Sequence, residues 1–351
     1  MSDSQVIDYK NLPSQIHSSL GELRWGYIGT GNIAKSVARD FALAGIQISA
    51  VGSRNIETAE SFAREFSIPR AHGSYEALVN DPEVDVVYIN TLNHVHCENT
   101  LLALNAGKHV LLEKPFTLNA GEAQQLADLA RSKNLFLMEA MWTRFLPGHR
   151  VIQEIIATGT IGTPYLFTAD HSQYLPEKTH NRLWDINIGG GALLDLGIYC
   201  VSYSNWILGD NPTRITSSSI ISHTNVDLSD VIALEYSTDS GVKAHAALTT
   251  SMAAAGTNTA AIVGSNGRIE IDSRFYNQTS FRVYDISGNL VGRYDEKVEG
   301  FGRQYQAIEV EQAIKAGKTE SEIMSLDATI ANMKVLDQIR DNCSLKYPQE
   351  G

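Results

Sequence analysis

Residues 25–34 read Trp25-Gly26-Tyr27-Ile28-Gly29-Thr30-Gly31-Asn32-Ile33-Ala34, and this stretch decides the fold. An apolar run with strand character precedes the glycines, and a segment with helical periodicity follows them. In that context Gly29 allows a tight turn, Gly31 lets the backbone approach a pyrophosphate, and Ala34 replaces a third glycine. Free N–H groups at the helix start bind the anion. The stretch predicts cofactor contacts at Gly29, Thr30, Gly31, Asn32 and Ile33; the alternative is that the glycines only shape a loop.

The segments around this loop alternate between strand-like and helix-like patterns as far as Met141. The strand-like runs are rich in Val, Ile and Leu, which is typical of parallel strands covered on both faces. They span 23–28, 46–52, 84–90, 109–113 and 135–140, and helical periodicity marks 33–44, 56–66, 98–106 and 120–133. The alternation predicts a doubly wound parallel sheet, a Rossmann domain.

The pattern changes after Pro147. Helices are expected at 151–158 and 192–208 and a strand at 165–171, followed by alternating strands at 217–223, 231–237, 242–251, 260–263, 268–271 and 280–286 and by helices at 305–316 and 326–340. Such a succession predicts an α+β domain with a large open, mostly antiparallel sheet. The expected boundaries are a loosely packed extension at 1–22, a dinucleotide-binding domain at 23–146, and a substrate-binding and dimerisation domain at 147–351, with the closing helices able to pack back on the first domain.

Composition restricts the class of protein. The chain has 351 residues, a formal net charge of −12 and no long acidic run, which disfavours nucleic acid as a partner. No apolar segment is long enough to span a membrane, and the polar start of the chain shows no signal peptide. Cys97, Cys200 and Cys343 lack metal-ligand or disulfide spacing, so a reduced, cytoplasmic setting is expected.

The end of the second strand bears on the choice of cofactor. An NAD enzyme usually presents a carboxylate to the ribose hydroxyls about 20 residues after the glycines. Here the strand ends Gly52-Ser53-Arg54-Asn55. With no carboxylate to repel a 2′-phosphate, and with Ser53 and Arg54 able to bind it, NADP is favoured. Alternatively, Arg54 is a solvated turn residue.

A lysine stands at the edge of the sheet where ligands bind. Glu113-Lys114-Pro115 ends the fourth strand, and Pro115 restricts Lys114 to extended geometry near the cleft. A structural salt bridge to a carboxylate is the alternative role for Lys114.

These segments together resemble the glucose-fructose oxidoreductase, inositol dehydrogenase and MocA family from about Leu23 to the end of the chain. The resemblance rests on residues 29–34, Asn93 with His96, residues 106–110 and 113–115, and 189–199. Because Tyr199 stands where many members have histidine, and because of residues 138–147, the chain is similar to a subgroup that includes dimeric dihydrodiol dehydrogenases and NADP-dependent xylose dehydrogenases. The resemblance implies further cofactor contacts at Thr91, Asn93, His96, Glu113, Lys114, Trp142 and Arg144.

The resemblance also implies a catalytic set of Lys114, Asp195 and Tyr199. The spacing agrees, because residues four apart share one helix face. A phenol with an ordinary pKa of about 10 accepts a proton only when a nearby cation stabilises the phenolate. We therefore expect Tyr199 to be the general acid/base, Lys114 to lower its pKa and orient the reacting oxygen, and Asp195 to position the lysine or a substrate hydroxyl. Alternatively, Tyr199 is a packing residue.

Other polar side chains are weaker candidates. A substrate wall is expected at the end of the strand at 165–171 and after it, where the candidates are His171, Tyr174, His180, Arg182 and Trp184. Of these, Tyr174, His180 and Trp184 are the expected substrate contacts beside Asp195. All of them read equally well as surface residues of a loop. His94 and His96 alternate, but no third metal ligand has suitable spacing, so no metal is expected.

The expected activity is NADP(H)-dependent transfer of hydride between nicotinamide and a CH–OH or C=O carbon of a sugar, polyol or trans-dihydrodiol. A reductase of ketosugars, anhydrosugars or dicarbonyls, and a non-catalytic NADP-sensing regulatory protein, are the alternatives. The uncovered face of the second sheet favours a homodimer.

Overall fold

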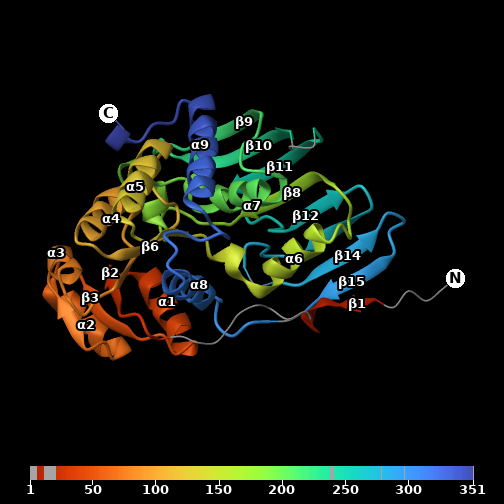
Figure 1. Ribbon diagram of the computed structural model, residues 1–351. Coiled ribbons are helices and arrows are strands. Elements are labelled where there is room, and N and C mark those ends of the chain that lie inside the picture. The colour runs from red at the N-terminus through yellow and green to blue at the C-terminus, as the bar shows by residue number, and fades with distance from the viewer. Residues whose placement is uncertain (1–5, 12–20, 238–240, 278, 296, 351) are drawn as a thin grey trace. The chain divides into compact units, whose positions relative to one another are not determined.

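The computed structural model describes residues 6–11, 21–237, 241–277, 279–295 and 297–350. It divides into two units (Figure 1). The parallel-sheet unit comprises Ile16–Phe145 and Glu299–Met333. The mixed-sheet unit comprises Met1–Gln15, Leu146–Val298 and Lys334–Gly351. The expected domain boundaries differ from these units mainly in the assignment of the chain ends, and the division into domains stays a prediction.

The parallel-sheet unit is built on six parallel strands in the order β4-β3-β2-β5-β6-β7. Their bounds are β2 Trp25–Ile28, β3 Ile48–Gly52, β4 Arg70–His72, β5 Val86–Ile89, β6 His109–Glu113 and β7 Leu137–Ala140. Every residue of β2, β5 and β7 is buried, as expected of strands covered on both faces. The predicted doubly wound parallel sheet is therefore confirmed.

Helices cover this sheet, and their starts follow from local sequence. The helices of the unit are α1 Asn32–Leu43, α2 Ile56–Phe66, α3 Tyr75–Val79, α4 His96–Asn105, α5 Ala120–Lys133 and α8 Gln304–Lys315, with 3-10 turns η2 Asn93–Val95 and η3 Trp142–Phe145. Asn55 and Asn119 cap α2 and α5 by accepting hydrogen bonds of 2.9 Å from Thr58 and Glu122 N–H groups. Helix α8 comes from late in the chain and packs against α1, so a closing helix completes this unit.

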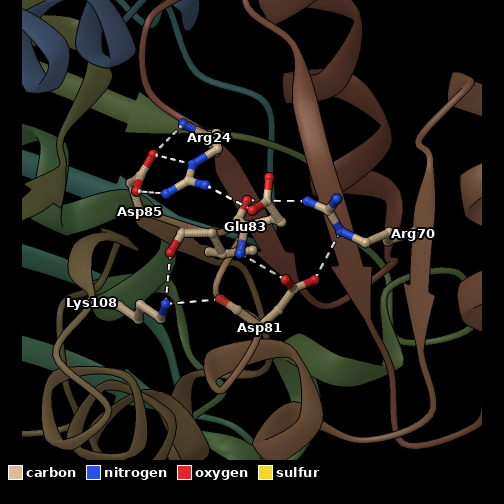
Figure 2. A network of polar contacts seen from close by, with 7 residues as sticks. Arg24, Arg70, Asp81, Glu83, Asp85 and Lys108 are labelled. Carbon is tan, nitrogen blue, oxygen red and sulfur yellow. Dashed lines mark hydrogen bonds and ion pairs between the residues drawn. The ribbon is translucent and has the colours of Figure 1, made fainter.

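A polar network fixes the amino ends of the strands (Figure 2). Arg24, just before β2, donates from Nε and Nη2 to the two carboxylate oxygens of Asp85, at 2.8 and 2.6 Å. Lys108 donates to the carbonyl of Asp81 at 2.9 Å, and Arg70 donates to the Asp81 carboxylate at 2.9 Å. The bidentate bond to Arg24 lowers the pKa of Asp85. Because ligands of open α/β sheets bind at the opposite, carboxyl edge, this network serves stability.

The mixed-sheet unit contains a nine-stranded sheet in the order β1-β15-β14-β13-β12-β8-β11-β10-β9. Its strands are β1 Ile7–Asp8, β8 Pro164–Ser172, β9 Arg214–Ile221, β10 Asp227–Ser237, β11 Lys243–Ser251, β12 Ala260–Gly264, β13 Gly267–Ile271, β14 Phe281–Asp285 and β15 Leu290–Tyr294. Within this sheet, only the pairs β1–β15 and β8–β11 are parallel among the described strands. The prediction of a large, mostly antiparallel sheet is confirmed.

The extension expected at 1–22 takes part in this sheet. Ile7 and Asp8 pair in parallel with Gly292 and Arg293, and the ring of Tyr9 packs 6.2 Å from that of Phe281. Residues 1–5 and 12–20 of the extension lie outside the described residues.

Helices cover one face of the mixed sheet. They are α6 Pro147–Ala157 and α7 Ile198–Leu208, with α7 packed on β8 and β11. His149 of α6 joins Tyr203 of α7 through a hydrogen bond of 2.9 Å. The remaining elements are the 3-10 turns η1 Tyr9–Asn11, η4 Asn181–Trp184, η5 Ile186–Ile188 and η7 Pro348–Glu350, the π-helical turn η6 Leu193–Gly197, and α9 Leu326–Asn342, which runs from one unit into the other. In the part of the chain that the structure describes, no helix combines the length and apolar character that a membrane span needs.

Candidate active site

The glycine loop follows the carboxyl end of β2 and leads directly into α1. Gly29 has φ +106°, and a Cβ there would lie 2.5 Å from Oδ1 of Asn90, so only glycine fits. Gly31 begins α1 without a side-chain cap, and a Cβ there would meet no atom within 4 Å. The open space and the free N–H groups of the helix start fit a pyrophosphate.

The end of β3 lies beside this loop in the sheet. The backbone of Gly29 donates to the carbonyl of Gly52 at 3.2 Å, and that of Ser53 donates to His72 at 3.1 Å. Ser53 is half-buried and Arg54 is exposed, with its side chain interacting with the hydroxyl of Tyr75. An exposed guanidinium therefore stands at the end of β3, the position from which dinucleotide-binding domains usually contact the ribose.

The loop after β5 is joined to the loop after β6 through a buried histidine. His96 is 1% exposed; its Nδ1 lies 2.8 Å from the carbonyl oxygen of Pro115, and its Nε2 lies 3.2 Å from that of Thr91. Burial lowers the pKa of His96 to about 4. Asn93 is also buried. In the structure His96 ties two backbone segments together, which places Lys114 next to the end of β5.

Two buried carboxyl groups lie near Lys114. Glu113 accepts a short hydrogen bond from the hydroxyl of Tyr88 and another of 3.2 Å from the backbone N–H of Lys114. Glu139 of β7, fully buried, accepts from Phe116 N–H and Thr329 Oγ1, each at 3.2 Å. Burial raises the pKa of both, that of Glu139 to about 7, and the charge of Lys114 partly offsets this.

Trp142 and Arg144 follow β7 in η3, and both are buried. Arg144 donates from Nη1 to the carbonyl of Ile323 at 3.3 Å, and its charge acts on Glu139. Arg144 is only 2% exposed, so in this structure it fixes the end of β7 rather than facing solvent.

In the mixed-sheet unit, Asp195 and Tyr199 lie on successive helical segments. Asp195 belongs to η6 and accepts a hydrogen bond of 3.1 Å from Arg182, and Tyr199 belongs to the first turn of α7. The sequence predicted one continuous helix over 192–208. The structure replaces its first turn by a π-helical turn, a feature frequent at functional sites.

Aromatic side chains fix the ring of Tyr199. His171 meets it edge-on at 5.2 Å, and His171 itself stacks on Tyr276 at 3.8 Å. Nδ1 of His171 lies 3.0 Å from the carbonyl of Leu196 in η6, and Gln173 donates to its Nε2 at 2.9 Å. This contact pattern assigns the proton of a neutral ring to Nδ1. His171 thus links the ring of Tyr199 to the π-helical turn.

The glycines before η6 are held by residues that sequence reasoning missed. Gly191 has φ +122°, and a Cβ there would lie 2.0 Å from Oδ1 of Asp227. Tyr347 donates its hydroxyl to the carbonyl of Gly190 at 2.9 Å. Burial, and the neighbouring Asp230, raise the pKa of Asp227 well above its usual range. The only sequence signal for Asp227 is an acid at the start of an apolar strand.

The candidate substrate residues Tyr174, His180 and Trp184 lie in the segment that follows β8. Tyr174 is 65% exposed, and His180 contacts the hydroxyl of Thr179. Trp184 donates its indole N–H to the carbonyl of Leu175 at 2.9 Å and packs on a small apolar cluster with Leu183. Among the described residues, no group of three or more His, Cys, Asp or Glu side chains could hold a metal ion.

Comparisons with known proteins identify the family of the chain. The model of an oxidoreductase family with an NAD-binding Rossmann fold, GFO_IDH_MocA, matches residues 23–141, and that of the GFO/IDH/MocA C-terminal domain matches residues 149–270. Curated relatives include trans-1,2-dihydrobenzene-1,2-diol dehydrogenases from Xenopus laevis, 35% identical over 93% of this chain and 99% of the relative, and from Homo sapiens, 32% identical with the same coverage.

Solved structures of similar fold include oxidoreductases. KijD10, a 3-ketoreductase from Actinomadura kijaniata in complex with NADP and TDP-benzene, is 27% identical, with a TM-score of 0.74 over 91% of this chain and 97% of that chain. An aldose-aldose oxidoreductase from Caulobacter crescentus, 22% identical, has a TM-score of 0.81 over 92% and 97%. With its two matched domains and its glycine loop, the chain belongs to the GFO/IDH/MocA family of oxidoreductases.

Proposed function

We propose that the protein is an NADP(H)-dependent dehydrogenase that transfers hydride between nicotinamide and a CH–OH or C=O carbon of a trans-dihydrodiol, sugar or polyol. The choice of NADP as cofactor rests on Ser53 and the exposed Arg54, which lie at the end of β3 beside the start of α1, a helix start without a side-chain cap. The dihydrodiol dehydrogenases among the relatives support the substrate class.

The bound dinucleotide supplies the hydride acceptor or donor. Residues 29–33 bind the pyrophosphate through backbone N–H groups, and Arg54 pairs with the 2′-phosphate, where its planar guanidinium makes charge-assisted hydrogen bonds. The NADP in the KijD10 complexes supports this choice. Thr91, Asn93, His96, Glu113, Trp142 and Arg144 stay predicted cofactor-binding residues. The contacts of His96 support a role in positioning the loops around Lys114, and the contact of Arg144 supports a role in fixing the end of β7.

Tyr199 is the proposed general acid/base, and it exchanges the proton of the reacting oxygen. Lys114 stabilises the phenolate and orients that oxygen, while Asp195 positions the lysine or a substrate hydroxyl. Tyr174, His180 and Trp184 are proposed substrate contacts. Lys114 belongs to one unit and Asp195 and Tyr199 to the other, so their meeting at the reacting carbon is part of the proposal.

The experiment follows the absorbance of the reduced nicotinamide in both directions of the reaction. NADP reduction is measured with trans-dihydrodiols, xylose and glucose, and NADPH oxidation with ketosugars and dicarbonyls, with NAD and NADH in parallel. Turnover of at least one CH–OH or C=O substrate with preference for NADP supports the proposal. Cofactor binding without turnover on the whole panel would instead favour the regulatory alternative.

A reductase of ketosugars is the second candidate function. The 3-ketoreductase KijD10 among the solved neighbours favours it. The same residues serve both directions, because a group that accepts a proton during oxidation returns it during reduction. The ratio of kcat/KM for ketosugar reduction to that for diol oxidation separates the two candidates.

The uncovered face of the mixed sheet is the proposed homodimer interface. Its side chains alternate with buried ones along the strands, and the larger apolar ones are Ile220 at 63% and Val231 at 60% exposure. An exposed apolar sheet face is typical of an interaction surface. Light scattering at micromolar concentration should give twice the chain mass of 38.5 kDa; a monomer would contradict the proposal.

The cytoplasmic location of the protein also stays a prediction.

A further inference from the structure

An arginine from the far end of the chain lies on the helix of the glycine loop. Arg303 directly precedes α8. The carboxylate of Asp40 in α1 accepts hydrogen bonds of 3.1 Å from the backbone N–H groups of Phe301 and Arg303. Gly300 has φ +71°, and a Cβ there would lie 2.4 Å from Oδ1 of Asp40. The segment before α8 is thus fixed to α1 through a close approach that favours glycine.

The side chain of Arg303 is fixed as well. Its Nη1 donates to Oγ of Ser36 in α1 at 2.7 Å. The guanidinium carbon lies 4.8 Å from the ring centre of Trp142 and 4.6 Å from that of Phe301. Arginine stacks on aromatic faces through its planar, weakly hydrated cation. One hydroxyl and two rings therefore hold the guanidinium in a defined orientation.

The charge of Arg303 has no carboxylate partner within ion-pair distance among the residues that the structure describes. A guanidinium has five N–H donors, and here one side-chain bond is made, while Nε is buried without a partner. The charge of Arg303 also acts at longer range on Glu113. A cation that is fixed and yet lacks an anion is suited to receive one from a ligand.

The position of Ser36 indicates which anion this is. Ser36 lies one helical turn, about 6 Å, after Asn32, the first residue of α1. Trp142 follows the carboxyl end of β7, so Arg303 stands between the carboxyl edge of the sheet and the start of α1. A dinucleotide places its pyrophosphate at that helix start.

We propose that Arg303 is a further cofactor-binding residue, whose guanidinium contacts the pyrophosphate of the bound dinucleotide. This inference rests on the dinucleotide site of the proposed function but not on the preference for NADP. The competing role is structural: Arg303 would only pack against Trp142 and Phe301 and compensate the charge of Glu113.

The experiment compares whole cofactors with fragments that lack the pyrophosphate. Binding of NADPH and NADH to the full chain is titrated by fluorescence, and 2′-AMP and adenosine, which both lack the 5′-phosphate, are titrated as competitors. Arg303→Met should weaken binding of the preferred dinucleotide about tenfold or more, since a charge-assisted hydrogen bond is lost. Affinity for the matching fragment should not change. Lys315→Met, on exposed Lys315 of α8, is the control for loss of one positive charge.

The outcomes separate the possibilities. If Arg303→Met weakens the fragment as much as the dinucleotide, or leaves dinucleotide affinity unchanged, the pyrophosphate contact is wrong. Arg303→Lys, which keeps the charge, should recover part of the lost dinucleotide affinity. If the wild-type protein binds NADH rather than NADPH, the NADP preference fails. The Arg303 inference is then decided by comparing NADH with adenosine.

Discussion

Asp227 and Leu193 are 34 positions apart, and Oδ2 of Asp227 accepts a hydrogen bond of 2.5 Å from the backbone N–H of Leu193. Leu193 is the first residue of η6, so this carboxyl fixes the start of the turn that carries Asp195 and leads into α7 with Tyr199. Because Oδ1 of Asp227 also lies against Gly191, a single side chain of β10 determines how the glycine segment enters the π-helical turn.

Replacing Asp227 by alanine should therefore disturb both stability and turnover. The buried N–H of Leu193 loses its acceptor, which costs about 1–3 kcal/mol in the free energy of unfolding. Asp227→Asn keeps an acceptor oxygen and should retain most of the stability and of kcat. Urea unfolding and steady-state kinetics of the two variants check this. Equal stability of the alanine and asparagine variants would show that the hydrogen bond to Leu193 is unimportant.

Much of the fold could be predicted because it depends on local patterns. The buried strands of the parallel sheet are apolar runs of Val, Ile and Leu, and the glycine loop has a fixed spacing. Strand β4, Arg70–His72, was missed because three residues with two polar side chains give no periodic signal. The π-helical turn was also missed, since Asp227, which binds the N–H of its first residue, comes from another part of the chain.

In the candidate site, too, residues of local motifs could be predicted, and residues that act through distant contacts could not. Residues 29–33, Lys114 and Tyr199 belong to local motifs, so sequence reasoning could name them. Glu139, Asp227 and Arg303 act through contacts with segments far along the chain, and their residue types alone are those of ordinary surface or strand positions. Only the structure shows that Glu139 is fully buried beside Phe116 N–H and Thr329.

Glu139 should make stability depend on pH in the neutral range. Burial raises its pKa from 4.5 to about 7 in the folded protein. Between these pH values the folded state binds a proton that the unfolded state has released, so the free energy of unfolding falls as pH rises. The change due to this group is about 3 kcal/mol. Glu139→Gln removes the ionisation, and its advantage over wild type should grow from pH 5 to pH 7.5.

Urea unfolding of both proteins across this range measures the difference. Other groups titrate equally in the two proteins, so the difference isolates Glu139. A constant difference at all pH values would contradict the raised pKa.

Arg54 should determine the choice between the two nicotinamide cofactors. Arg54→Ala removes the proposed partner of the 2′-phosphate, so KM for NADP should rise about tenfold, as expected for a lost charge-assisted hydrogen bond, and KM for NAD should not change. Arg64→Ala on α2, where Arg64 is 72% exposed, controls for the loss of a nearby positive charge. A parallel rise of both KM values would assign Arg54 a structural role.

Tyr199→Phe should lower kcat by about 10²-fold or more and leave NADPH affinity unchanged, because only the proton-transferring hydroxyl is removed. The ring contact with His171 is retained, so the variant should fold normally. Tyr203→Phe is the matched control on the same helix: its hydroxyl bonds to His149, so its loss should cost about 1 kcal/mol of stability without slowing turnover. If Tyr199→Phe turns over at the wild-type rate, or both variants lose activity alike, Tyr199 is not the acid/base.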